Sequence, residues 1–99
     1  MFEKLLKQYT GYNFIKEYRF YEKRRWRFDY ANIEKKIAIE IEGGAWSGGR
    51  HTRGKGFIGD MEKYNMAVAE CWAVLRFTPS QMKESKTYEF IKMVIEKRL

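Results

Sequence analysis

Cysteine, proline and histidine are nearly absent from this 99-residue chain, which has one of each. The lone Cys71 has no partner for an internal disulfide, which argues against a disulfide-stapled secreted scaffold. Cys71 lies in the apolar run AECWAVL, so we expect a buried thiol and not a nucleophile. No apolar run approaches the ~20 residues of a membrane span. The N-terminal MFEKLLKQYTG lacks the apolar stretch of a signal peptide. We therefore expect a cytoplasmic protein that does not bind membranes.

Positive charge exceeds negative charge, with 20 Lys and Arg against 13 Asp and Glu and a net charge of +7. An excess of this size favours a polyanionic partner such as nucleic acid. The basic residues form two clusters on either side of an acidic segment: Lys23, Arg24, Arg25 and Arg27, then Arg50, Arg53 and Lys55. The length and the 44% hydrophobic content fit a single domain over residues 1–99.

Hydrophobic periodicity predicts an α/β fold in the order helix, three strands, helix, strand, helix. The helix at the start should end at Gly11, and the apolar run WAVLRF is interpreted as a buried strand. Trp26 and Trp72 are predicted to be core residues. The expected elements cover residues 1–10, 18–20, 24–31, 35–42, 57–71, 72–77 and 86–99.

The second and third predicted strands gather acids in an otherwise basic chain. Alternation in RRWRFDYA should put Trp26, Phe28 and Tyr30 on one face and Arg25, Arg27 and Asp29 on the other. KKIAIEIE alternates in the same way, with Glu40 and Glu42 opposite its isoleucines. If the two strands pair antiparallel with their apolar faces matched, Asp29 joins Glu40 and Glu42 on one face. Opposed or diagonal neighbours on such a pair lie roughly 4.5–8 Å apart. The pattern therefore predicts an acidic patch of three carboxylates.

Two interpretations of this patch are open. Glu40 and Glu42 could be the wet face of a half-exposed strand. The alternative is a divalent metal site, because like charges on one face repel unless something neutralises them. Mg²⁺ takes oxygen ligands and is usually held by one or two carboxylates with waters and phosphate oxygens. Asp29 and Glu40 would be its ligands, and the ion would draw in a scissile phosphate and lower the pKa of bound water.

The segment RRWRFDYA…IAIEIEGGAWSGGRHTRGKGFIGDMEKYN…CWAVLRF resembles the PD-(D/E)XK nuclease superfamily. The resemblance covers roughly residues 14–77. Within the superfamily it is greatest to small endonucleases of phages and prophages. These enzymes are related to very-short-patch-repair-like and Holliday-junction-resolvase-like nucleases. It implies a restriction-endonuclease-like αβββαβ core, with a mixed central sheet flanked by helices and a C-terminal helix. It also implies a Mg²⁺- or Mn²⁺-dependent DNA endonuclease that hydrolyses phosphodiester bonds, acts in a bacterial host on branched or mismatched duplex, and leaves a 5′ phosphate. A homodimer is compatible with such an endonuclease.

The resemblance assigns roles to particular residues. Asp29 and Glu40 match the metal-binding acids, and Glu17 matches a third acid that often completes such sites, although it could be an ordinary surface residue. The family's lysine, two positions after the metal-binding Glu, is replaced here by Glu42, which can bind metal or accept a proton but supplies no positive charge. Lys63 on the following helix is the natural substitute, unless it forms an ordinary ion pair. Lys55 is a weaker substitute.

The glycine-rich segment 43–56 (GGAWSGGRHTRGKG) is expected to be a basic loop. Its His51 could donate a proton to the leaving oxygen, contact a phosphate or be exposed. Trp46 could stack on a base or pack against the protein. The residues expected to bind nucleic acid are Arg25, Arg27, Trp46, Arg50, Arg53 and Lys55.

The missing family lysine motivates a second hypothesis, a non-catalytic nucleic-acid-binding module on a decayed nuclease fold. A basic protein-interaction domain is a third possibility, and it predicts no salt-dependent affinity for DNA.

Overall fold

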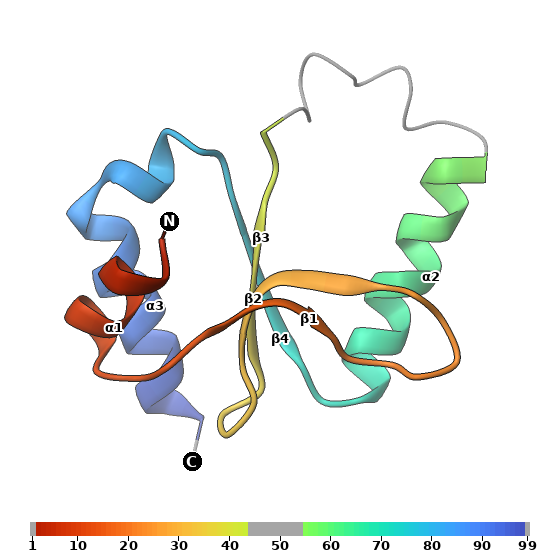
Figure 1. The fold of residues 1–99 in the computed structure, drawn as a ribbon, viewed down its shortest axis with the longest axis horizontal. Helices are drawn as coiled ribbons and strands as arrows, with labels where there is room; N and C mark the ends of the chain where they lie inside the picture. Colours follow the sequence, from red (N-terminus) through yellow and green to blue (C-terminus); the bar gives the residue numbers. More distant parts are fainter. Residues whose placement is uncertain (1, 44–54, 99) are drawn as a thin grey trace.

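The computed structural model describes residues 2–43 and 55–98. It contains three α-helices, one 3-10 helix and four strands in the described ranges, and it confirms the predicted order of elements (Figure 1). The elements are α1 (Glu3–Thr10), β1 (Ile15–Arg19), β2 (Arg27–Asn32), β3 (Ile37–Ile41), α2 (Lys55–Ala69), β4 (Ala73–Phe77), η2 (Gln81–Lys83) and α3 (Ser85–Lys97).

The four strands form one mixed sheet in the order β1-β2-β3-β4. The first three pair antiparallel, and β4 pairs parallel to β3. A parallel pair needs a crossover connection, and α2 lies in that connection. Helices α1 and α3 lie together on one side of the sheet and α2 lies on the other (Figure 1). Because β4 is an edge strand, its apolar residues are only half-buried, and the prediction of a fully buried strand is wrong.

The larger part of the core lies between the sheet and the pair α1 and α3. Ile37 and Ile39 of β3 are fully buried there against Leu6 of α1 and Tyr88 and Ile91 of α3. The isoleucines alternate with residues of the opposite face, as the sequence pattern predicted. This side of the sheet therefore supplies most of the apolar burial that stabilises the fold.

A second, smaller cluster lies on the α2 side of the sheet. Phe28 is fully buried there with Ala38, Ala67 and Trp72. The rings of Phe28 and Phe20 stack with their centroids 4.2 Å apart. Trp72 is a core residue, as predicted, because only 6% of its surface is exposed.

The side-chain alternation of β2 changes phase at Asp29, so Phe28 and Tyr30 lie in different core clusters. The prediction that they share a face is wrong. Opposite Asp29, Glu17 of β1 has a φ of 52°, a left-handed conformation that interrupts regular extended backbone. The register on either side is regular, with Lys16 opposite Tyr30 and Tyr18 opposite Phe28.

Two helix ends show how residue type and backbone geometry combine. Gly11 ends α1 with φ 83° and donates its N–H to the Lys7 carbonyl, as predicted. Cys71 has φ 68° just beyond α2, where its N–H bonds to Val68 and the Trp72 N–H bonds to Ala67. This is the Schellman pattern. It leaves Cys71 exposed, so the prediction of a buried thiol is wrong.

Within the described ranges, no helix combines the length and apolar character that crossing a membrane requires.

We expect Leu6→Ala to lower the free energy of unfolding by about 2–5 kcal/mol, because it opens a cavity where a fully buried side chain joins α1 to the core. Lys4→Ala, on the exposed side of the same helix, is the control and should change the free energy of unfolding little. Urea unfolding followed by circular dichroism measures both. Equal stabilities for the two variants would contradict the role assigned to α1.

Candidate functional site

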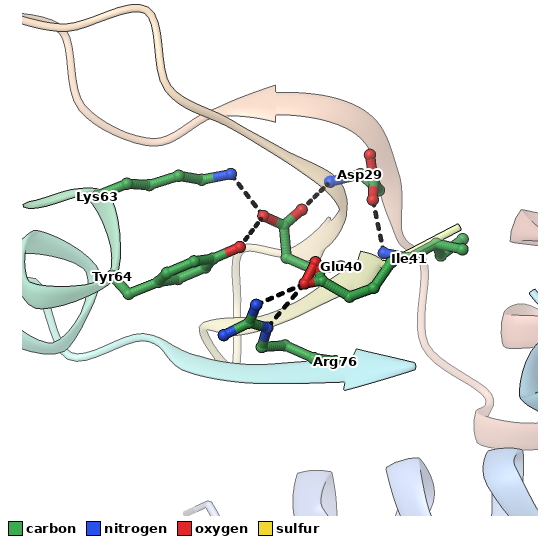
Figure 2. A network of polar contacts seen from close by, with 7 residues as sticks. Asp29, Glu40, Ile41, Lys63, Tyr64 and Arg76 are labelled. Carbon is green, nitrogen blue, oxygen red and sulfur yellow. Dashed lines mark hydrogen bonds and ion pairs between the residues drawn. The ribbon is translucent and has the colours of Figure 1, made fainter. Parts of the chain in front are cut away.

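Glu40 is a charged residue buried in the middle of the fold. It lies in β3, and only 6% of its surface is exposed. A carboxylate out of contact with water needs hydrogen-bond donors or a counter-charge. Glu40 has both, from two different elements (Figure 2).

Helix α2 supplies two of the donors. The ammonium Nζ of Lys63 lies 2.5 Å from Oε1 of Glu40, and the side chains of this ion pair are 14% and 8% exposed. The hydroxyl of Tyr64 donates to the same oxygen over 2.9 Å. Lys63, which the resemblance makes the substitute for the family's lysine, therefore forms an ion pair with the third-strand acid in the structure.

Asp29 and Glu40 are joined by reciprocal hydrogen bonds between side chain and backbone. The backbone N–H of Asp29 donates to Oε2 of Glu40 over 3.1 Å. One residue along β3, the N–H of Ile41 donates to Oδ2 of Asp29 over 2.6 Å. In Figure 2 the Asp29 carboxylate points toward Ile41, and the Glu40 carboxylate points toward Lys63 and Tyr64. The two acids are therefore neighbours on adjacent strands, and each is held by its own set of donors.

The orientation of α2 differs from the one its sequence pattern suggested. In FIGDMEKYNMAVAEC (residues 57–71), helical spacing predicts one apolar stripe that contains Phe57, Met61, Tyr64, Val68 and Cys71. Met61 and Val68 are instead 49% and 72% exposed. The face turned to the sheet carries Ala67 in the core, and one turn earlier Lys63 and Tyr64. With this face inward, the buried Glu40 carboxylate has Lys63 and Tyr64 as its partners on the helix.

Glu42 is bound to a different cation. Arg76 of β4 donates from both Nε and Nη2 to Oε2 of Glu42, over 3.0 and 2.6 Å. Its guanidinium also lies 4.6 Å from the centre of the Tyr64 ring. Each of the three acids of the predicted patch therefore has its own partner: Lys63 for Glu40, Arg76 for Glu42 and the Ile41 N–H for Asp29. The carboxylate of Asp29 points toward Ile41 and not toward α2 (Figure 2).

Tyr64 and Arg76, which contact the carboxylates of Glu40 and Glu42, have raised pKa values. Burial, together with the negative charge of Glu40, raises the pKa of the Tyr64 hydroxyl well above its ordinary value of 10.0. The hydrogen bond to Glu42 raises the pKa of Arg76, which is positively charged in any case. Tyr64 is therefore a hydrogen-bond donor throughout the physiological pH range.

Glu17 lies beside Asp29 and apart from the buried group. Together with Asp29 and Ile41 it lines a surface hollow of about 230 Å³. Its side chain is 62% exposed and lies 3.9 Å from Arg27. An exposed pair at this distance contributes little to stability.

Several predicted nucleic-acid-binding residues are not part of the described structure. Trp46, Arg50, His51 and Arg53 lie outside the described residues. Lys55 begins α2, but its side chain also lies outside the description. Arg25 and Arg27 are exposed on or beside β2, and Asp60 is exposed on α2.

The donor chemistry partly fits the predicted metal. Among residues 2–43 and 55–98, no group of three or more His, Cys, Asp or Glu side chains is placed to hold a metal ion. Asp29 and Glu40 nevertheless supply two carboxylates on adjacent strands, and Mg²⁺ is usually held by one or two carboxylates plus water and phosphate. The pair fits such an ion if Lys63 gives up its place at Glu40.

Tyr64 and Arg76 are the site residues that the sequence analysis missed. Tyr64 was assigned to the apolar stripe of α2, and Arg76 is a lone charge in the apolar run WAVLRF. That lone charge was the available signal, because an arginine within a strand needs an acidic neighbour. Glu40 lies directly opposite Arg76 in the parallel pair.

No family model matches this chain, and comparisons with curated proteins and with solved structures find no match.

We expect Tyr64→Phe to destabilise the protein by about 1–3 kcal/mol at neutral pH, because Glu40 loses a donor. The pKa of Tyr64 is raised on folding, so its contribution is complete below pH ~10 and declines above it, where the unfolded chain releases the proton. The difference in the free energy of unfolding between wild type and Tyr64→Phe should therefore become smaller above pH ~10. Urea unfolding at pH 8 and pH 10.5 measures it.

Tyr18→Phe is the control for this prediction, since Tyr18 packs against Trp72 through its ring. Tyr18→Phe should lower the free energy of unfolding much less than Tyr64→Phe at neutral pH. A Tyr64→Phe variant as stable as wild type at pH 8 would contradict the assigned hydrogen bond.

Proposed function

We propose that this protein is a metal-dependent DNA endonuclease that hydrolyses phosphodiester bonds. The observation that carries the proposal is the grouping of Asp29, Glu40 and Lys63. The two acids lie on adjacent strands and are joined by hydrogen bonds from backbone to side chain, and a lysine from the next helix contacts one of them. Two carboxylates beside a lysine are groups that phosphodiester hydrolysis can use.

The surroundings support a polyanionic substrate. The net charge of +7 attracts DNA over long range. A mixed sheet with helices on both sides is compatible with the restriction-endonuclease-like core that the sequence resemblance implies. Action in the cytoplasm of a bacterial host, on branched or mismatched duplex and as a homodimer, stays a prediction.

In this proposal Asp29 and Glu40 would hold Mg²⁺ or Mn²⁺, with Glu17 as a further acid at the exposed side. A bound divalent ion would supply positive charge to the scissile phosphate and activate water. Lys63 provides a second positive charge, which stabilises the charge that develops on the phosphate oxygens. Arg76 keeps Glu42 neutralised, so that Glu42 does not repel the approaching phosphate. His51 remains a candidate proton donor to the leaving oxygen.

A non-catalytic nucleic-acid-binding module is the second candidate. It is favoured by the fact that protein donors already engage the carboxylates of Asp29, Glu40 and Glu42. In that case the Glu40–Lys63 pair would be purely structural, and the basic surface would bind nucleic acid without cutting it.

We expect the wild-type protein to nick supercoiled or branched DNA with Mg²⁺ or Mn²⁺ and to lose this activity in excess EDTA. Glu40→Gln should abolish cutting while DNA binding is kept or improved, because a negative charge is removed. Agarose-gel nicking assays and fluorescence anisotropy measure the two properties. Glu89→Gln, on the exposed surface of α3, is the control and should cut normally. DNA binding without nicking by the wild type would favour the second candidate.

We expect Lys63→Met to lower the rate of cutting roughly 10²- to 10⁴-fold, since a positive charge at the reacting phosphate is lost. Removing one partner of a buried pair also destabilises proteins by about 3–5 kcal/mol, so the rate is compared at a temperature where thermal unfolding shows the variant folded. Lys86→Met, whose side chain is 83% exposed, is the matched control. A folded Lys63→Met variant that cuts DNA at the wild-type rate would show that Lys63 has no role in the reaction. Lys55 and His51 would then be the next residues to test.

A further inference from the structure

A second concavity lies between the connection from β1 to β2 and the outer side of α2. Its volume is about 440 Å³, which falls in the range of ligand-binding clefts, roughly 300–1,000 Å³. Asp29, Glu40 and Lys63 are not among the residues that line it. The lining side chains that matter here are Tyr21, Lys23, Arg24, Trp26, Glu62 and Asn65.

Aromatic rings form one wall of this concavity. The rings of Tyr21 and Trp26 lie nearly parallel, at 21° with their centroids 5.9 Å apart. Phe20 continues the stack on Trp26, at 18° and 6.2 Å. Trp26 is only half-buried, which corrects its assignment to the core. The stack holds the half-buried Trp26 ring in a fixed orientation, and a base that stacks on this ring shares it with the Arg24 guanidinium or displaces that group.

Cations lie at the same wall. The Arg24 guanidinium lies over the Trp26 ring, 4.2 Å from its centre. Its ion pair with Glu62 spans 3.8 Å between side chains that are 46% and 54% exposed. An exposed ion pair of this kind contributes little to stability. Arg24 can therefore release Glu62 and bind another anion. Lys23 also lines the concavity, and Arg25 is exposed in the same segment.

The opposite wall belongs to α2, where the polar Glu62 and Asn65 lie beside the apolar Met66 and Ala69. Asn65 offers an amide that both donates and accepts hydrogen bonds, and Glu62 offers acceptor oxygens. Flat rings, flanking cations and an amide match the parts of a nucleotide: a base with a π face and a polar edge, attached to a phosphate. A base-paired duplex hides the faces of its bases, so the match is to a nucleotide outside the stack.

We propose that this concavity binds one unpaired nucleotide of a DNA substrate, with the base against Tyr21 and Trp26 and its phosphate near Lys23 and Arg24. The inference rests on the proposed function and specifies its substrate as DNA that contains an unpaired nucleotide. Helix α2 links the two sites, because it carries Lys63 toward Glu40 and presents Glu62 and Asn65 to the concavity.

The test measures binding without cutting. Fluorescence anisotropy in EDTA compares three labelled duplexes of one sequence: fully paired, with one bulged nucleotide, and with a bulged abasic sugar-phosphate. The wild-type protein should bind the bulged nucleotide about 5-fold or more tightly than the other two, since stacking of one base contributes at least this much in alanine-substitution measurements. The abasic duplex keeps the bulge and its phosphate and removes only the base, so no variant has to fold for this arm.

Variants then locate the effect. Trp26→Ala and Tyr21→Ala should each remove most of the preference for the bulged base and leave binding to the paired duplex nearly unchanged. Phe90→Ala, an aromatic residue of α3 that is 46% exposed, is the control and should keep the preference. Circular dichroism confirms that each variant is folded.

The possible outcomes separate this inference from the proposed function. Equal affinity of the wild type for the bulged and abasic duplexes, or a preference that survives in folded Trp26→Ala, overturns the nucleotide site whatever the nicking assay shows. A preference that depends on Trp26 supports the site even if the nicking assay fails and the endonuclease proposal falls. Absence of any DNA binding overturns both.

Discussion

The rest of the structure depends on one buried charge, the Glu40 carboxylate in β3. An ionised group at 6% exposure is tolerated only when donors surround it. Its donors come from β2 through the Asp29 backbone and from α2 through Lys63 and Tyr64. The same contacts fix the rotation of α2 about its axis, and that rotation leaves Met61 and Val68 in solvent.

The arrangement gives Glu40 two alternative partners in the proposed activity. Lys63 neutralises it in the structure described here, and a divalent ion shared with Asp29 would neutralise it in the catalytic complex. Both are cations next to the same oxygens, so they compete unless Lys63 moves toward the phosphate. The exposed hollow lined by Glu17 and Asp29 opens to Asp29, and Glu40 is not among the residues that line it.

The sequence predicted the order of elements, because strong periodicity and short connections limit how the strands can pair. Lys63 was named through the family resemblance and not through periodicity, and the structure places its ammonium beside Glu40. Prediction from the sequence failed where tertiary contacts override local pattern. The side-chain alternation of β2 changes phase opposite the left-handed Glu17, so Phe28 and Tyr30 lie in different core clusters. The Schellman end of α2 exposes Cys71 despite its apolar surroundings. Arg76 was missed because its partner Glu42 is 34 residues away in the chain, and no local pattern reports so distant a pairing.

The most direct test of the account is a crystal structure of the protein soaked with Mn²⁺, with anomalous diffraction used to locate the ion. The account predicts one Mn²⁺ bound to carboxylate oxygens of both Asp29 and Glu40, with the ammonium of Lys63 moved away from Oε1 of Glu40. Anomalous signal elsewhere or nowhere, with the Glu40–Lys63 pair intact at saturating Mn²⁺, would contradict it.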